Sequence, residues 1–188
     1  MFDSTGRRLD INQNIIMENM NEFELKKSND LQNTFEEFGY RFNEFGQLRH
    51  ITTGAAYEFN VKEEDHTFNQ RRYEALGNLV TGYVYDLLEK ECGLKKMTVP
   101  LDAHGGEPTT FIFHSDDAFT NEKIVILIHG TGIVRAGQWA GRLIINDSLN
   151  SGTQIPFIKH AKGLGYGVIV FNTNDNKITV KGGFEAFG

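Results

Sequence analysis

The sequence predicts an α/β fold in which helices flank a sheet and a β-hairpin precedes it. Residues 65–92 repeat apolar side chains at helical spacing, which indicates a long amphipathic helix. Residues 123–128 and 167–171 contain short runs of branched aliphatic residues, and a predicted helix separates them. A strand, a helix and a second strand make a βαβ unit, whose two strands lie parallel in one sheet.

Composition limits the classes of function. The 188 residues are 39% apolar and 23% charged, as in a globular domain. The formal charge is −6 and the basic residues are scattered, so we expect no direct nucleic-acid binding. The first thirty residues are polar, and no run reaches the roughly 20 apolar residues that span a bilayer. The single cysteine, Cys92, allows no disulfide within the chain, so we expect a soluble intracellular protein.

Three segments follow from the density of apolar residues. Residues 1–33 are polar and predict a weakly ordered tail, and residues 34–172 predict the ordered body. The apolar pattern fades over residues 173–188, where we expect a divergent tail that closes no element. The body begins with alternation at 40–42 and 48–51 around a turn that contains Gly46, which predicts a hairpin with a third short strand at 57–59.

The helix over 65–92 has signals at both ends. Asp65 is a predicted N-cap, and Gly93 is a predicted stop. Gly77 and Gly82 weaken a helix, and we expect them to let another backbone approach closely. The predicted apolar stripe consists of Tyr73, Leu76, Val80, Val84 and Leu87, widened by Tyr83 and Leu88.

The sheet is expected from four later segments. Strands are predicted at 97–99, 110–113, 123–128 and 167–171. Five consecutive aliphatic residues at 124–128 indicate a central strand covered on both faces. Thr153 is a predicted cap for the connecting helix, Pro156 fits its first turn and Gly165 ends it. Its predicted apolar stripe is Ile155, Ile158, Ala161 and Leu164.

The segment whose residues suit catalytic chemistry follows the first buried strand. His129, Gly130, Thr131 and Gly132 stand where ligands gather in open α/β sheets, and glycines there allow backbone N–H groups to face an oxyanion. α/β-hydrolases use a His-Gly segment at this place for that purpose. The alternative is a tight turn in which His129 hydrogen-bonds a neighbouring strand. A phosphate-binding loop is disfavoured because no Gly-Lys-Ser or Gly-Lys-Thr follows.

No nucleophile accompanies this loop in the sequence. Catalysis by serine needs a strained strand-to-helix turn, usually G-x-S-x-G, and none of the serines has that context. Ser151 follows a polar loop, and Ser115 is better read as a helix cap. The six histidines lack metal-binding spacing, so we predict no catalytic residue, no metal and no cofactor. Arg135, Gln138 and Trp139 form a candidate contact patch for a partner, although packing of Trp139 in the core is favoured.

Several longer sequence segments resemble those of the animal branch of the Argonaute-binding (Arb2) domain family. The resemblance covers about residues 30–172, and the segments fall in order along the chain. They are FGYRFN at 38–43, GQLRHI at 46–51, NQRRYEALG at 69–77, VILIHG at 125–130, VRAGQWA at 134–140, RLIIN at 142–146, SGTQIPFIK at 151–159 and GYGVIV at 165–170.

The resemblance implies an incomplete α/β-hydrolase-like sheet. Family members act with Argonaute in RNA silencing, or at chromatin and splicing machinery, mainly in the nucleus. In longer relatives the nucleophile serine and the histidine follow the second buried strand, and no position here corresponds to them. His129 and Gly130 match the oxyanion-like positions. The resemblance therefore implies a truncated paralogue, in which residues 124–128 would form an apolar sheet edge.

Three functions remain open at this point. The favoured one is a non-catalytic module that binds Argonaute or chromatin- or splicing-associated proteins, in the nucleus and also the cytoplasm. The second is a serine-hydrolase-like esterase that needs a C-terminal half from elsewhere. The third is the product of a truncated gene copy without function.

Overall fold

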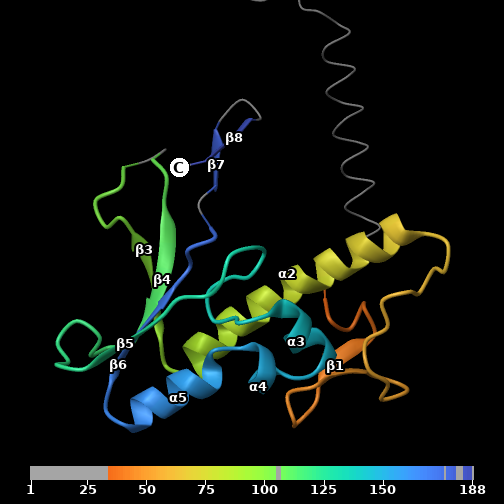
Figure 1. Ribbon diagram of the computed structural model, residues 1–188, viewed down its shortest axis with the longest axis horizontal. Helices are drawn as coiled ribbons and strands as arrows, with labels where there is room; N and C mark the ends of the chain where they lie inside the picture. Colours follow the sequence, from red (N-terminus) through yellow and green to blue (C-terminus); the bar gives the residue numbers. More distant parts are fainter. Residues whose placement is uncertain (1–33, 105–106, 176, 181–183, 188) are drawn as a thin grey trace, which may run out of the picture.

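The computed structural model describes residues 34–104, 107–175, 177–180 and 184–187. The tail predicted at 1–33 lies outside the described residues. The rest is a mixed α/β fold with an N-terminal hairpin, a four-stranded sheet and flanking helices, which confirms the predicted fold class (Figure 1).

The hairpin is confirmed. Strands β1 (Tyr40–Phe42) and β2 (Leu48–His50) pair antiparallel, with Tyr40 opposite His50. The turn is held by the Asn43 side chain, whose Oδ1 accepts from the backbone N–H groups of Phe45 and Gln47. Gly46 has φ of 69°, a value that a side chain disfavours.

The third strand predicted at 57–59 is wrong. Tyr57 is buried against Tyr40, and Phe59 packs on Tyr73, so both aromatic rings serve the core without a strand partner. The backbone of Glu58 is satisfied by side chains instead. Its N–H donates to the Tyr40 hydroxyl, and its carbonyl accepts from Arg72 at 3.1 Å. The alternation of Tyr57 and Phe59 therefore reflects the packing of both rings on the core, and not a strand.

The long helix is α2 (His66–Lys90), with both predicted signals in place. Asp65 Oδ1 accepts from the N–H of Phe68 at 2.9 Å, and Gly93 has φ of 61° just after the helix. The buried side also contains two polar residues that the apolar pattern did not include. Arg72 lies among the rings of Phe38, Tyr40 and Tyr57, and Asn69 donates to the carbonyl of Lys62 at 2.7 Å.

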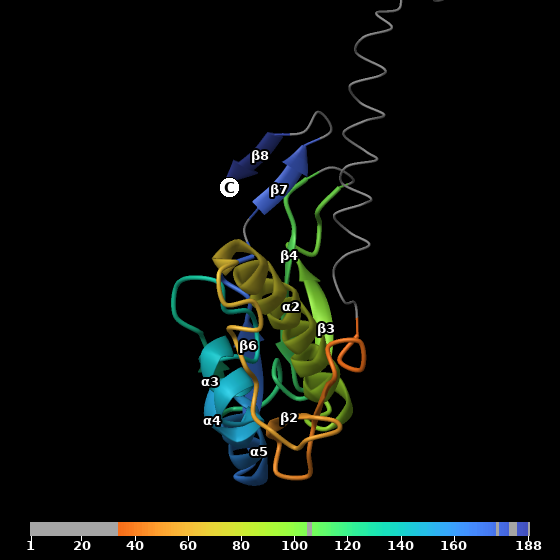
Figure 2. The same cartoon turned by 90° about the vertical axis from the view of Figure 1, so that its right-hand side faces the viewer.

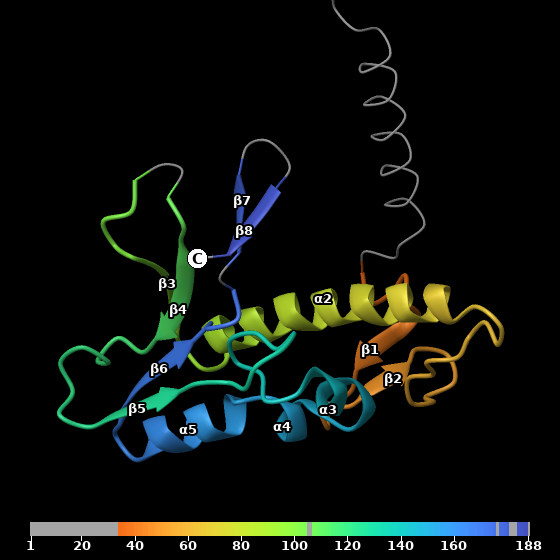
Figure 3. The same ribbon diagram turned by 45° about the horizontal axis from the view of Figure 1, so that its top comes forward.

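The main sheet has the order β3-β4-β6-β5. Its strands are β3 (Lys95–Val99), β4 (Thr110–His114), β5 (Ile124–Leu127) and β6 (Gly167–Phe171). The pair β5–β6 is parallel, which confirms the βαβ unit, and the other two pairs are antiparallel. In the three views, α2 runs past the sheet, and the helices α3, α4 and α5 lie in a row beside α2 (Figures 1, 2 and 3).

The connecting helix is α5 (Ile155–Gly163), which begins one position later than predicted. Gln154 is the N-cap, while the Thr153 hydroxyl accepts from the Ile155 N–H at 3.3 Å. Ile155, Ile158 and Ala161 are buried as expected. Leu164 is 62% exposed, because it stands past the last helical residue and no longer follows the stripe.

Two short helices and one hairpin have no counterpart in the sequence prediction. Helices α3 (Gly141–Asn146) and α4 (Leu149–Gly152) are too short for apolar periodicity to reveal them. Strands β7 (Lys177–Val180) and β8 (Phe184–Phe187) pair antiparallel within the segment where no element was expected.

The two faces of the sheet are covered unequally. Val168 and Val170 of β6 join a core cluster that includes buried residues of α2, α3 and α5. Because strand side chains alternate, the intervening Ile169 points to the other face, where it belongs to a small cluster with Ile112 and Ala118. No helix contributes to that second cluster among the described residues.

Strand β5 is an edge strand, so its predicted central position is wrong. Val125 and Leu127 belong to the helix-covered core, whereas Ile124 and Ile126 are 43% and 52% exposed on the other face. The central strand is β6, which pairs on both sides. Five aliphatic residues in a row therefore mark a strand with one covered face and one bare apolar face. The edge position of β5 agrees with the arrangement that the family resemblance implied.

The expected role of Gly77 and Gly82 is also wrong. Nothing lies within 4 Å of a Cβ built at either position. Close approach to α2 is instead allowed by Gly137, where a Cβ would lie 2.8 Å from Leu88 and 2.9 Å from Val84. It has φ of 82°, so both its backbone and its neighbours require glycine.

We expect the bare edge to make the purified chain prone to self-association. Exposed apolar edge strands are templates for pairing with further copies. We expect chain 1–188 to sediment as oligomers, and Ile126→Lys to shift it toward monomer because a charge on the edge opposes pairing. Leu101→Lys is the control, since Leu101 is 79% exposed in the loop after β3. A monodisperse wild-type monomer with one cooperative urea transition would contradict this expectation.

Candidate functional site

The site lies where β5 and β6 end. Parallel strands have their carboxyl ends at the same end of the sheet, so the loop after β5 meets the segment after β6. The first loop carries the predicted oxyanion-type residues His129, Gly130, Thr131 and Gly132. The second segment, 172–175, carries polar side chains that contact this loop.

His129 is 5% exposed and bonds within its own loop. Its Nδ1 lies 3.0 Å from the carbonyl oxygen of Gly130 and 3.3 Å from the side-chain amide nitrogen of Asn174. The opposite ring nitrogen, Nε2, is buried without a hydrogen-bond partner among the described residues. The alternative, a bond from His129 to a neighbouring strand, has a counterpart in the contact with Asn174, which follows β6.

Two asparagines after β6 fix the loop. Asn172 Oδ1 accepts from the buried N–H of Ala136 at 3.0 Å. Asn174 Nδ2 donates to the carbonyl of Gly130 at 2.9 Å and to that of Val134 at 3.2 Å. Sequence analysis missed both residues, although their position directly after a buried parallel strand is the signal that could have found them.

The loop keeps unpaired backbone donors. In the described part of the chain, no acceptor is recorded for the backbone N–H groups of residues 130–135. Gly130, Thr131 and Gly132 are exposed, and Gly132 has φ of 111°. Asn174 holds the carbonyls of Gly130 and Val134 in place. The oxyanion-type role that the sequence suggested for residues 129–132 stays a prediction.

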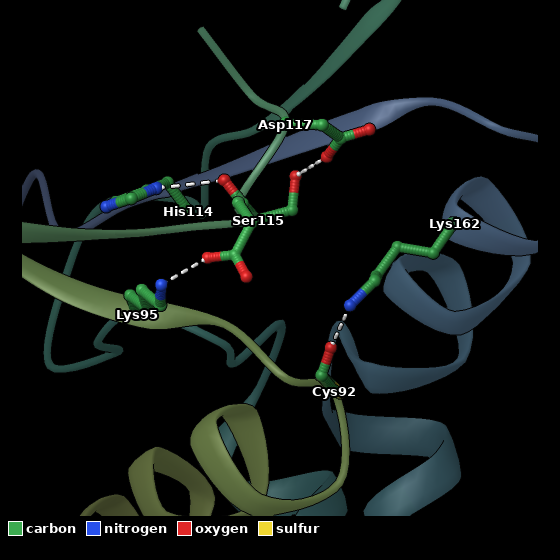
Figure 4. Close-up of polar contacts among 7 residues, drawn as sticks. Cys92, Lys95, His114, Ser115, Asp117 and Lys162 are labelled. Atoms are coloured by element: carbon green, nitrogen blue, oxygen red, sulfur yellow. Dashed lines mark hydrogen bonds and ion pairs between the residues drawn. The ribbon is translucent and has the colours of Figure 1, made fainter.

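Ser115 cannot act on a ligand at this loop. It is 1% exposed, and its Oγ donates to Asp117 at 2.6 Å and accepts from the N–H of Val168 at 2.9 Å (Figure 4). His114 Nδ1 faces the carbonyl of Ser115, 2.9 Å away, and not the hydroxyl. Val168 lies near the start of β6, so Ser115 lies at the end of the sheet where β5 and β6 begin, whereas His129 lies where they end. The helix that Ser115 was expected to cap is a turn.

The remaining described serines stabilise local structure. Ser148 caps α4 by accepting from the N–H of Ser151 at 3.2 Å. The Ser151 hydroxyl contacts that of Ser148 at 3.0 Å and also donates to Asp147. No histidine or lysine partner is recorded for either hydroxyl among the described residues, so nothing activates them.

The ion pair and the thiol that lie near Ser115 also have structural roles. An exposed ion pair joins Lys95 and Asp116 at 2.6 Å, and the hydrogen bond from Lys95 lowers the pKa of Asp116. Burial raises the pKa of the Cys92 thiol, which keeps it protonated and unreactive. The carbonyl of Cys92 accepts from Lys162, which joins the end of α2 to α5.

The described residues hold no cluster of three potential metal ligands. Within the same part of the chain, the helices are too short or too polar to cross a membrane.

The three candidate contact residues do not form one exposed patch. Gln138 is 3% exposed, and its Nε2 donates to Thr81 at 2.9 Å. Trp139 is half-buried and meets Phe157 edge-to-face at 5.6 Å, as its core alternative predicted. Arg135 is half-buried and donates to the carbonyls of its two preceding residues. Their contact role for a partner stays a prediction.

Removal of the Asn172 side chain tests the pinned loop. In Asn172→Ala the buried N–H of Ala136 loses its acceptor, so we expect the free energy of unfolding to fall by about 1–3 kcal/mol. Urea denaturation measures this change. Asn146→Ala is the matched control, because its amide donates from the exposed surface to Arg142 within α3. Equal effects of the two substitutions would contradict the assigned role of Asn172.

Comparison with known proteins gives one family. A model of the Arb2 domain matches residues 31–184. The Cotranscriptional regulator ARB2A of Homo sapiens is 61% identical over 153 residues, which is 81% of this chain and 37% of the human protein. The mouse protein of that name is 60% identical over the same shares. The Gallus gallus homolog is 61% identical over 149 residues, 79% of this chain and 36% of its own length.

No solved structure matches this chain. The chain spans less than two fifths of the length of these curated relatives.

Proposed function

The chain belongs to the Arb2 domain family, and from this membership we propose that it is a non-catalytic regulator that acts by binding other proteins. Its relatives are named cotranscriptional regulators, which supports a role beside transcription. The partner class that we propose is Argonaute or a protein of chromatin or splicing, met in the nucleus and also in the cytoplasm.

The observation that carries this proposal is the bare apolar edge of the sheet. Ile124 and Ile126 of β5 are 43% and 52% exposed, and Ile128, directly after the strand, is 57% exposed. The outer backbone groups of β5 have no neighbouring strand in the described part of the chain. A partner that adds an extended strand would pair those groups and cover the isoleucines.

The magnitudes favour such binding. Full burial of an isoleucine side chain contributes about 1.5–3 kcal/mol relative to exposure. A half-exposed side chain therefore leaves roughly half of that available to a partner. A lysine on the same edge would lose this contribution and place a charge in the contact.

Capture of purified Argonaute on immobilised chain 1–188 tests both the partner and the surface. We expect wild type to retain Argonaute and Ile126→Lys to weaken the affinity about tenfold or more, equivalent to at least 1.4 kcal/mol. Leu101→Lys adds the same charge away from the edge and should bind as wild type. Binding constants from biolayer interferometry give the comparison.

The outcomes separate the two parts of the proposal. Retention that is unchanged in Ile126→Lys would place the contact elsewhere on the chain. Failure of wild type to retain Argonaute would remove Argonaute as the partner and leave chromatin or splicing proteins to be tried on the same three variants.

A second candidate is a serine-hydrolase-like esterase, favoured by the unpaired N–H groups after His129. Such an enzyme would need a nucleophile from another chain or segment. We expect a fluorophosphonate probe to leave chain 1–188 unlabelled, because the described serine hydroxyls are engaged in structural bonds. Labelling that disappears when one serine is replaced by alanine would establish the enzyme instead.

A further inference from the structure

A cavity of about 350 Å³ lies between α2 and residues 133–145. Tyr73, Gly77 and Thr81 line it from the helix, and Val134 and Gln138 line it from the opposite segment. Figure 3 shows these two parts of the chain side by side. The volume falls within the range of small-molecule sites, which are mostly apolar with a few convergent polar groups.

One polar group in this cavity has a fixed orientation. The hydroxyl of Thr81 donates to the carbonyl of Gly77 at 3.0 Å, so toward Gln138 it can only accept. The Gln138 amide must therefore turn its Nε2 to Thr81, at 2.9 Å. Its Oε1 is left beside Gly141 without a recorded donor among the described residues. A ligand with an N–H or O–H group would satisfy this acceptor.

Gly77 keeps the cavity open. Glycine inside a helix is less stable than alanine, and nothing in the chain lies within 4 Å of a Cβ at this position. Packing of the protein therefore gives no reason for glycine there. A larger side chain at 77 would project into free space and reduce the cavity that Gly77 lines.

The remaining lining residues include aromatic and aliphatic side chains and two opposite charges, Glu74 and Arg135. Tyr73 and Tyr85 stand on the helix side and Val134 stands opposite, which suits a flat apolar ring. Arg135 also lines the cavity, and only its Nη1 is recorded as a donor within the described chain. The other guanidinium N–H groups can pair with a carboxylate.

We propose that this cavity binds a small aromatic carboxylic acid that carries a ring N–H. The ring lies between α2 and Val134, the N–H donates to Gln138 Oε1, and the carboxylate pairs with Arg135. This binding is independent of the sheet edge, which lies on β5, and of any partner bound there.

Saturation-transfer NMR with chain 1–188 at micromolar concentration tests the proposal, using indole-3-acetate as the probe. We expect binding of indole-3-acetate, and about tenfold weaker binding of 1-methylindole-3-acetate, which lacks the ring N–H. Arg135→Gln should weaken indole-3-acetate about tenfold and leave uncharged indole unchanged.

Gly77→Leu is the decisive variant, with Gly82→Leu as its matched control. Both replace a glycine of α2 that has no neighbour within 4 Å, and Gly82 does not line the cavity. Since leucine is a better helix former than glycine, both variants should fold, which circular dichroism verifies. We expect Gly77→Leu to abolish the saturation-transfer signal and Gly82→Leu to retain it.

Three results would overturn the assignment. They are no signal from indole-3-acetate with folded wild type, equal signals from the two glycine variants, or equal affinity for the methylated and unmethylated probes.

Discussion

Strand β6 is the constraint on which the fold depends. It pairs antiparallel with β4 on one side and parallel with β5 on the other. Val168 and Val170 are fully buried under the helices, so one strand joins the sheet to the core. The Ser115 hydroxyl accepts from the first part of this strand, and Asn172 follows its last residue. Both ends of β6 therefore anchor loops.

The same arrangement explains the exposed edge. All the buried apolar side chains of the described helices belong to the cluster on one face of the sheet, and no described helix contributes to the cluster on the second face. Ile169 is nevertheless 9% exposed, because β4 and β5 flank it on both sides. Ile126 on β5 has one neighbouring strand and is 52% exposed. An edge position converts a core-like sequence into a surface.

The loop at the strand ends has donors without an attacking group. Asn174 donates to the carbonyls of Gly130 and Val134. The backbone N–H groups of residues 130–135 have no acceptor among the described residues. The described serines are committed to turns and caps. Electrostatic stabilisation of an oxyanion can assist a reaction, but bond cleavage by serine also needs an activated hydroxyl.

Local signals in the sequence predicted the boundaries of α2. They could not predict features that depend on tertiary context, such as the position of a strand in the sheet. Asp65 and Gly93 defined α2 because capping depends on neighbouring residues only. Apolar content could not tell an edge strand from a central one, since that difference depends on sheet order. The loop residues from His129 to Gly132 were proposed as a site from their place after a strand. Asn174 was not, because its partner lies 44 residues earlier at Gly130.

Hydrogen–deuterium exchange of β5 is the most direct test of the central claim that its bare edge is a binding surface. The amides of residues 124–128 should gain protection when the chain binds its partner, measured on the purified complex against the chain alone. Protection confined to other parts of the chain, with β5 exchanging at its free rate, would contradict the claim.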